Sequence, residues 1–258
     1  LGSAELNINA LASQWASAFM SIDYDSSTAN PILGNLDNSS RLYMRRAFVT
    51  IGDLNVTPLY GSLGQMYVPF GTYSYMLVTS PVTSSLAKTD STAVTLGYHH
   101  KGVTVVAYGF NGHSVFNNIS PNKIDSWGTN ASWAGHLFGD KQIFGVGYIS
   151  TLADGLSQLD AGTYVANLTR TEVPGLNLNA NLHFHHVNLI AEYICALSNF
   201  KTLDFASPAP IDATPRPSAL DVELGYQFTQ LPRPLSVYAV YDHTTEGANF
   251  NAILMLPL

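Results

Sequence analysis

Every second residue is apolar over residues 176–185, and the residues between them are asparagine or histidine. A period of two is the pattern of a β-strand, in which successive side chains point to opposite faces of the sheet. The alternation returns over residues 187–199, 218–229 and 234–243. The stretch from residue 175 to residue 242 therefore predicts successive strands with one apolar and one polar face.

Most of these runs are roughly nine to twelve residues long, the length a tilted strand needs to cross a bilayer. Strands in globular proteins typically have about five or six residues. The alternation alone fits a soluble β-sandwich as well as a membrane barrel, because both folds give a sheet one apolar and one polar face. Strand length and the layout of the loops must separate the two folds.

Charged residues make up only 11% of the 258 residues, against roughly 25% in ordinary globular domains. The sequence has no run of about 18 apolar residues that would predict a transmembrane helix. Low charge without such a run is typical of a membrane β-barrel, whose lipid-facing residues alternate with polar ones. The net charge of −7 argues against nucleic acid as a partner, and the single Cys195 excludes an intrachain disulfide framework.

The connections between the predicted strands alternate between short turns and long loops. Such alternation places all turns at one end of the sheet and all long loops at the other, as in outer-membrane barrels. The expected long loops are 25–41, 68–92, 111–125, 152–174 and 201–217. The expected strands are 3–12, 15–24, 42–52, 59–67, 93–99, 103–110, 126–136, 142–151, 175–185, 187–199, 218–229, 234–243 and 249–258.

We therefore predict an all-β fold, an antiparallel transmembrane up-and-down β-barrel that forms a single domain over residues 1–258. Barrels of this kind begin with a rising strand, whereas the first strand here descends into a short turn at residues 13–14. The chain also ends without the aromatic residue that barrel chains commonly carry. We expect about 14–16 strands, with strands missing from the given chain at both ends.

Three nearby segments resemble one known family. They are AFVTIGDL at residues 47–54, PLYG at 58–61 and GQMYVPFGTY at 64–73, and they look like the LbtU-type siderophore porin family of Gram-negative outer membranes. The likeness covers most of the chain from about residue 42 onward, and its most specific part is residues 67–71. It implies an outer-membrane β-barrel without an N-terminal plug that takes up iron, usually as a ferric siderophore and in some relatives as ferrous iron.

Polar residues on the predicted inner face are the first candidates for contacts with a solute. They comprise a ladder of amides and imidazole on one strand and an acidic patch on the strands that follow. The acidic patch could hold a cation or form hydrogen bonds with the periphery of a chelate, or its members could simply be solvated by lumen water. These residues are Asn177, Asn179, Asn181, His183, Glu192, Asp221, Glu223 and Asp242.

A metal site is the second hypothesis, because His183 and His185 lie on one face and Glu192 would lie on the adjacent strand. Imidazole together with carboxylate suits iron(II) or zinc. The cluster lies at a short turn, however, where histidine is common, and His99 begins a similar pair at another turn. We favour solvated turn histidines and expect neither a bound metal nor a cofactor.

The 68–92 loop is the strongest candidate for narrowing the lumen. It follows Tyr67 and carries Phe70 and Tyr73 among several apolar residues that would not stay exposed to water. If the loop folds into the barrel, it buries these groups and constricts the pore. The alternative is a loop packed over the rim or against a partner.

Arginines near the loop end of the third predicted strand are candidates for anion contacts at the rim. Arg41, Arg45 and Arg46 could attract lipopolysaccharide phosphates or an anionic chelate, or could simply keep the strand end in water. We expect the barrel to contact outer-membrane lipid and lipopolysaccharide.

The first functional hypothesis is an outer-membrane transporter for iron, as a ferric siderophore or another small solute. The second is a binding or structural barrel with a closed lumen, and the third is a soluble β-sandwich. The sequence lacks Gly-x-Ser-x-Gly and His-Glu-x-x-His motifs, and we do not expect an enzyme. The sequence leaves the oligomeric state open.

Overall fold

The structure is a computed structural model that describes residues 3–25, 41–76, 80–112, 123–137, 139–152, 172–200, 216–229 and 235–245. Its described residues form one antiparallel sheet of 12 strands, in which the spatial order of the strands is their order in the chain. The strands are β1 (Ser3–Ser13), β2 (Ala16–Asp25), β3 (Arg41–Ile51), β4 (Leu59–Tyr67), β5 (Asp90–His100), β6 (Val103–Phe110), β7 (Ser126–Leu137), β8 (Asp140–Ile149), β9 (Gly175–Phe184), β10 (Val187–Ala196), β11 (Ser218–Phe228) and β12 (Leu235–Thr245).

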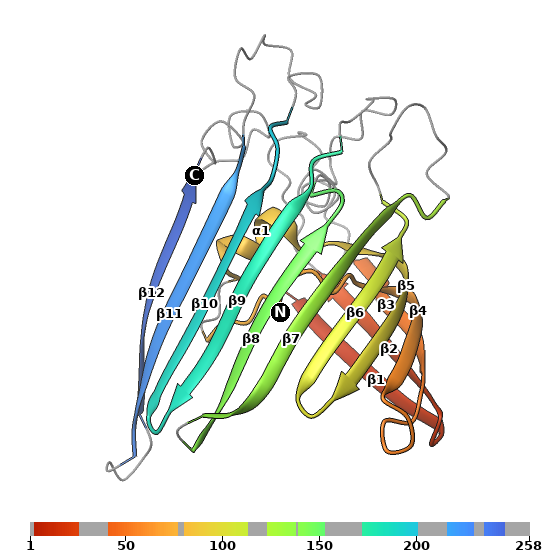
Figure 1. Cartoon of the computed structure of the whole chain (residues 1–258), viewed down its shortest axis with the longest axis horizontal. Coiled ribbons are helices and arrows are strands. Elements are labelled where there is room, and N and C mark those ends of the chain that lie inside the picture. Colours follow the sequence, from red (N-terminus) through yellow and green to blue (C-terminus); the bar gives the residue numbers. More distant parts are fainter. Residues whose placement is uncertain are drawn as a thin grey trace.

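The sheet curves around a short helix, α1 (Val82–Ala87), which packs against β10, β11 and β12 (Figure 1). We call the side of the sheet that faces α1 the inner face and the opposite side the outer face. Within the described residues no ladder of hydrogen bonds joins β12 to β1, and no helix is long and apolar enough to span a bilayer.

The all-β, antiparallel, up-and-down fold is confirmed, and so are twelve of the predicted strands. The thirteenth predicted strand, 249–258, lies outside the described residues. β5 begins at Asp90, earlier than the pattern predicts, because Asp90 to Thr92 pair with Tyr67 to Gln65 of β4. The long connection after β4 is therefore residues 68–89.

Short and long connections alternate along the chain, as the sequence predicts. Each odd-numbered strand from β1 to β9 reaches the next strand through a short connection at the same end of the sheet (Figure 1). At the β5–β6 turn, Lys101 and Gly102 have φ angles of 48° and 81°, the positive values of a tight type I′ hairpin.

The outer face carries exposed apolar side chains that alternate with buried inner ones. On β5 the outward Val94, Leu96 and Tyr98 are 43%, 63% and 41% exposed, while the inward Ala93 and Thr95 are buried. Aromatic pairs also cover the outer face, such as Trp133 and Phe144, whose ring centroids lie 6.1 Å apart. Exposed leucine, valine and aromatic side chains that alternate with inward residues along a strand are the pattern of a lipid-facing barrel wall.

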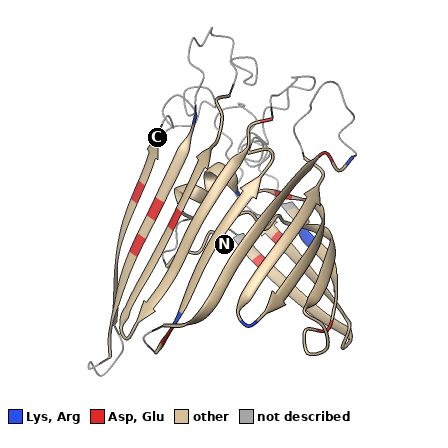
Figure 2. Cartoon of the chain, in the orientation of Figure 1, with Lys and Arg blue, Asp and Glu red and all other residues tan. Residues whose placement is uncertain are grey.

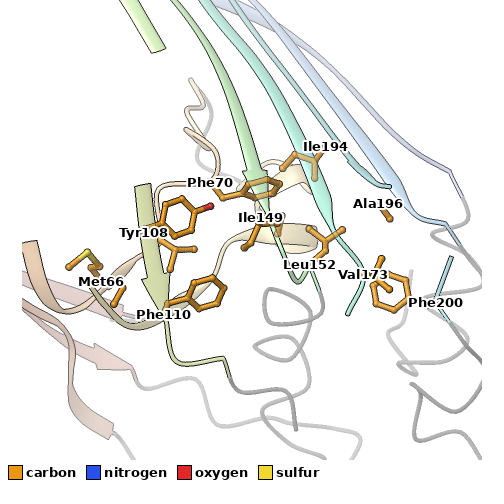
Figure 3. Packing of buried hydrophobic residues seen from close by; sticks show 13 residues of the cluster. Met66, Phe70, Tyr108, Phe110, Ile149, Leu152, Val173, Ile194, Ala196 and Phe200 are labelled. Atoms are coloured by element: carbon orange, nitrogen blue, oxygen red, sulfur yellow. The ribbon is translucent and has the colours of Figure 1, made fainter. Parts of the chain in front are cut away.

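The buried apolar core lies on the inner face, between the wall and the segment that follows β4. Phe70 from this segment lies among Tyr108, Ile149 and Ile194 of the wall (Figure 3). Phe70, Ile149 and Ile194 are each 0% exposed. The inner face is therefore filled here by the protein's own chain and not by a second sheet, as it would be in a β-sandwich.

Candidate functional site

Residues 68–89, which we call the constriction segment, leave β4 and fold against the inner face. The segment is described at residues 68–76 and 80–89. Its two ends are joined by a hydrogen bond of 3.0 Å, which the amide of Val68 donates to the carbonyl oxygen of Thr89. Val68 is 2% exposed and Ala87 is 0% exposed, so the base of the segment is part of the core.

The first turn of the constriction segment lies directly on strands β7 and β8. The side-chain amide of Asn130 donates a hydrogen bond of 3.3 Å to the carbonyl oxygen of Phe70. A Cβ atom at Gly147 would overlap that same carbonyl oxygen. The absence of a side chain at Gly147 therefore lets the segment approach the wall this closely.

Glu192 on β10 is the point where most hydrogen bonds between the wall and the segment meet. Its Oε1 accepts hydrogen bonds from the amides of Thr72 (2.9 Å) and Tyr73 (3.4 Å), and its Oε2 accepts one from the Thr83 hydroxyl (2.9 Å). A further bond of 2.8 Å comes to Oε1 from the side-chain amide of Asn177 on β9. Glu192 is 1% exposed, so hydrogen bonds from these donors replace nearly all of the water around its carboxylate.

The other residues of the predicted acidic patch lie on the neighbouring strands β11 and β12, where Figure 2 shows a group of acidic positions. Asp221 pairs in register with Glu192 on one side and with Asp242 on the other. Glu223 accepts a hydrogen bond of 2.5 Å from the amide of Met76. Asp221 is 0% exposed, and neither of its carboxylate oxygens has a hydrogen-bond partner among the described residues, whereas Asp242 on β12 is exposed.

The amide ladder of β9 divides into two parts. The side chain of Asn179 donates a hydrogen bond of 2.7 Å to Asn177, which in turn bonds Glu192. Asn177 and Asn179 are 0% and 8% exposed, so both belong to the buried network behind the constriction segment. Asn181 and His183 are only partly buried, and His183 bonds the side chain of Asn188 near the β9–β10 turn.

The histidines and Glu192 do not come together. His183 bonds Asn188, His185 lies 3.8 Å from the carboxylate of Asp140, and Glu192 bonds the constriction segment. Within the described residues, no three His, Cys, Asp or Glu side chains converge in a way that would hold a metal ion.

A group of cations and aromatic rings lies on the opposite part of the wall, at β3. A bulge between β2 and β3 leaves Arg45 without a register partner, so Arg45 and Arg46 both reach inner-face partners although they are neighbours in sequence. Arg45 forms an ion pair of 3.0 Å with Asp23, and Arg46 forms one of 2.7 Å with Glu5. The side chain of Arg41 lies outside the described part of the structure.

Tyr67 connects this group to the constriction segment. Its hydroxyl oxygen accepts a hydrogen bond of 3.3 Å from Arg45. The guanidinium carbon of Arg46 lies 4.8 Å from the centroid of its ring. From the segment, the ammonium nitrogen of Lys88 lies 4.2 Å from the same centroid. Burial, together with the positive charges of Arg45 and Arg46, lowers the pKa of Lys88 below its ordinary value.

Tyr73 lies within the constriction segment in the left-handed region of backbone conformation, with φ of 48°. Its ring packs against the buried core, and burial raises the pKa of its hydroxyl well above the ordinary value. The sequence analysis selected Tyr67, Phe70 and Tyr73 as pore-lining. In the structure Phe70 lies in the core, Tyr73 packs against the core, and Tyr67 contacts the cations.

Two residues that matter here were given no structural role in the sequence analysis. Lys88 follows α1, a helix of only six residues that leaves no strong signal in the sequence. Gly71 lies where a Cβ atom would be only 2.7 Å from Oε1 of Glu192. The glycine within the Tyr67-to-Gly71 motif was the one available signal for such a close approach.

Known proteins resemble this chain in sequence and in fold. No family model matches the chain. The chain is 37% identical over 255 residues to a UPF0422 protein of Coxiella burnetii, a match that covers 95% of this chain and 51% of that protein. It is 32% identical over 269 residues to a UPF0422 protein of Legionella pneumophila strain Lens, covering 97% of this chain and 48% of that protein. The chain thus spans about half the length of these curated relatives, and their names state no substrate.

Among solved structures, the chain resembles the high-pH structure of Pseudomonas putida OprB, with a TM-score of 0.52 and 12% sequence identity. The match covers 93% of this chain and 67% of that one. A likeness at this identity concerns the fold. None of the named relatives is called a siderophore porin, so iron uptake is a matter for proposal. The chain has the all-β, barrel-type fold of a bacterial outer-membrane porin.

Proposed function

We propose that this chain forms the wall of a porin-like channel in the bacterial outer membrane, and that small solutes cross it through a lumen narrowed by the constriction segment. The observation that carries the proposal is the position of this segment on the inner face, bonded to the wall at Glu192, Glu223 and Asn130. A loop fixed inside a barrel reduces its open cross-section, whereas a loop over the rim does not.

The outer face supports the membrane part of the proposal. The side chains of Leu63, Leu96 and Leu224 are 62%, 63% and 49% exposed on the outer face. Burying such a face in hydrocarbon removes it from water at a gain of roughly 25 cal/mol per Å² of apolar surface. Lipid of the outer membrane is therefore the proposed partner of this face.

We propose iron as the cargo, carried as a ferric siderophore that reaches the constriction as an anionic chelate. The resemblance of residues 47–73 to LbtU-type siderophore porins supports this cargo. The cations Arg45, Arg46 and Lys88 around Tyr67 support it as well, because guanidinium groups recognise carboxylate and phenolate oxygens through charge-assisted hydrogen bonds. Arg45 and Arg46 have inner-face partners, so we assign them to the solute in preference to lipopolysaccharide.

The solute would pass between two unlike sides of the wall. On the side of Tyr67, the side chains of Arg45 and Arg46 are 38% and 23% exposed. On the acidic side, Glu192 and Glu223 are 1% and 2% exposed beneath the constriction segment. The partly buried side chains of Asn181 and His183, together with the exposed Asp242, remain as further proposed contacts for the solute.

Two measurements test the proposal. In planar bilayers, the full-length protein should form open channels, and deletion of residues 70–80 should raise the single-channel conductance because the segment then no longer occupies the lumen. Ferric-siderophore binding to the purified protein, measured by tryptophan fluorescence against the iron-free siderophore, tests the cargo. If the channels conduct but the protein binds no ferric siderophore, the proposed channel stands and the proposed iron cargo is wrong.

A binding or structural barrel with a closed lumen is the second candidate. It is favoured by the apolar cluster of Phe70, Phe110, Ile149 and Leu152, which are each 0% exposed between segment and wall. If this packing seals the lumen, the folded protein inserts into bilayers without conducting, and the deletion of residues 70–80 opens it.

A further inference from the structure

We propose that Glu192 is the positioning residue of the channel: its buried carboxylate fixes the constriction segment to the wall and thereby sets the width of the pore. This inference rests on the proposed function, because a positioning residue presupposes a lumen that the segment narrows. In this proposal, the buried Glu192 and Glu223 bind the protein's own segment and not a cation or a solute.

The hydrogen bonds of Glu192 connect two separate parts of the segment. Oε1 accepts from the amides of Thr72 and Tyr73, which follow the first turn. Oε2 accepts from the hydroxyl of Thr83 in α1. One carboxylate therefore holds the incoming and the returning arm of the segment at the same point of β10.

The charge of Glu192 is balanced by these donors. No lysine or arginine in the described part of the chain forms a salt bridge with Glu192. A buried carboxylate is costly unless hydrogen bonds replace its hydration, and bonds from neutral donors to a charged acceptor are roughly twice as strong as neutral ones. The segment and the carboxylate consequently stabilise each other.

Close packing around the carboxylate restricts the segment to one position. A Cβ atom at Gly71 would lie 2.7 Å from Oε1 of Glu192 and 3.0 Å from the side-chain nitrogen of Asn177. Asn177 itself donates to Oε1 and accepts from Asn179, so the carboxylate cannot rotate without breaking bonds on the wall. The carboxylate is thus held from behind by β9 and offers its remaining acceptor sites to the segment.

Replacement of Glu192 by glutamine is the sharpest test, because the shape is kept while one acceptor oxygen becomes an NH₂ donor. If the new NH₂ takes the place of Oε1, it faces the amides of Thr72 and Tyr73, which cannot accept; if it takes the place of Oε2, the hydroxyl of Thr83 must change from donor to acceptor. In both orientations the negative charge that strengthens these hydrogen bonds is lost. Glu172→Gln is the matched control: it makes the same substitution at an exposed glutamate just before β9, and no hydrogen bond joins Glu172 to the described part of the segment. Both variants are made in the full-length protein, and heat-modifiable migration on gels verifies that they fold.

The primary readout is hydrogen exchange of the segment amides in detergent. In Glu192→Gln, the amides of Thr72 and Tyr73 should exchange at least about tenfold faster, since their charged acceptor is lost. The amide of Val68, which bonds Thr89 at the base of the segment, should keep its protection. Unchanged exchange at Thr72 and Tyr73 in the folded variant would overturn the assignment, whether or not the protein conducts.

Conductance links the anchor to the pore. Glu192→Gln should raise or destabilise the single-channel conductance, and Glu172→Gln should not. In the protein that lacks residues 70–80, Glu192→Gln should cause no further change in conductance. An equal effect of Glu192→Gln with and without the segment would show that the residue acts elsewhere. A protein that never conducts contradicts the channel, while the exchange experiment still decides the anchor.

Thr83→Val tests the same anchor from the side of the segment, without a change in the wall. It leaves Glu192 and β10 intact and removes only the hydroxyl that bonds Oε2. We expect a smaller gain of exchange at Thr72 and Tyr73 than in Glu192→Gln, and no gain at all would contradict a shared anchor for the two arms.

Discussion

Lys88 lies with its ammonium nitrogen 4.2 Å from the centroid of the Tyr67 ring, on which Arg46 also rests at 4.8 Å. Arg45 and Arg46 form salt bridges with Asp23 and Glu5, whereas Lys88 forms no salt bridge among the described residues. Two cations on one ring repel each other, and a nearby anion reduces this repulsion. The ring of Tyr67 thus joins the wall, the constriction segment and the proposed path of an anionic solute.

Lys88→Gln should therefore reduce the preference of the channel for anions. Removing one half-buried positive charge weakens the attraction for chloride along the lumen. The ratio of chloride to potassium permeability, obtained from the reversal potential in a salt gradient, checks this. Lys141→Gln, which removes an exposed charge at the start of β8, is the control and should leave the ratio unchanged.

The same site gives a dependence on pH. Because burial and the neighbouring arginines lower the pKa of Lys88, its ammonium group is charged below that lowered value and neutral above it. The part of the anion preference that Lys88 contributes is present at low pH and is lost as pH rises through a value below the ordinary 10.5. Lys88→Gln should flatten this step, and a step of equal size in both proteins would assign it to another group.

Gly147→Ala should displace the first turn of the constriction segment. The new Cβ atom would overlap the carbonyl oxygen of Phe70, a backbone atom that can move only with the segment. We expect faster proteolysis within the segment and a higher conductance in the folded variant. Ala131→Val adds volume to the outer face of the neighbouring β7 and should change neither quantity. Wild-type behaviour of Gly147→Ala would mean that the segment does not rest on β8.

Leu224→Arg should destabilise the protein far more than Gln227→Arg. Leu224 lies on the outer face in the middle of β11 and is 49% exposed, so the new charge would sit in hydrocarbon at a cost of about 2–4 kcal/mol near the midplane. Gln227 is an inner-face residue near the end of β11, where water can solvate an arginine. Urea titration in lipid vesicles measures both free energies of unfolding. Equal tolerance of the two substitutions would mean that the faces are assigned wrongly.

The sequence determined the strands and their faces. The alternation of residues such as Leu176 and Asn177 has the period of the backbone itself, so the local pattern assigns side chains to the outer or inner face wherever the strand has no bulge. The alternating lengths of the connections likewise determined which end of the sheet carries the long loops. These are properties of short stretches of chain, and they need no knowledge of distant contacts.

Tertiary structure alone decided what the inner face does. Glu192 meets Thr72 and Thr83 across more than a hundred residues of sequence, and the bulge that turns both Arg45 and Arg46 toward the lumen breaks the alternation from which faces are read. The sequence analysis therefore placed Glu192 among the lumen ligands and the arginines at the rim. A hydrogen bond depends on which atoms approach within about 3 Å, and that approach is set by how the whole sheet curves around its constriction segment.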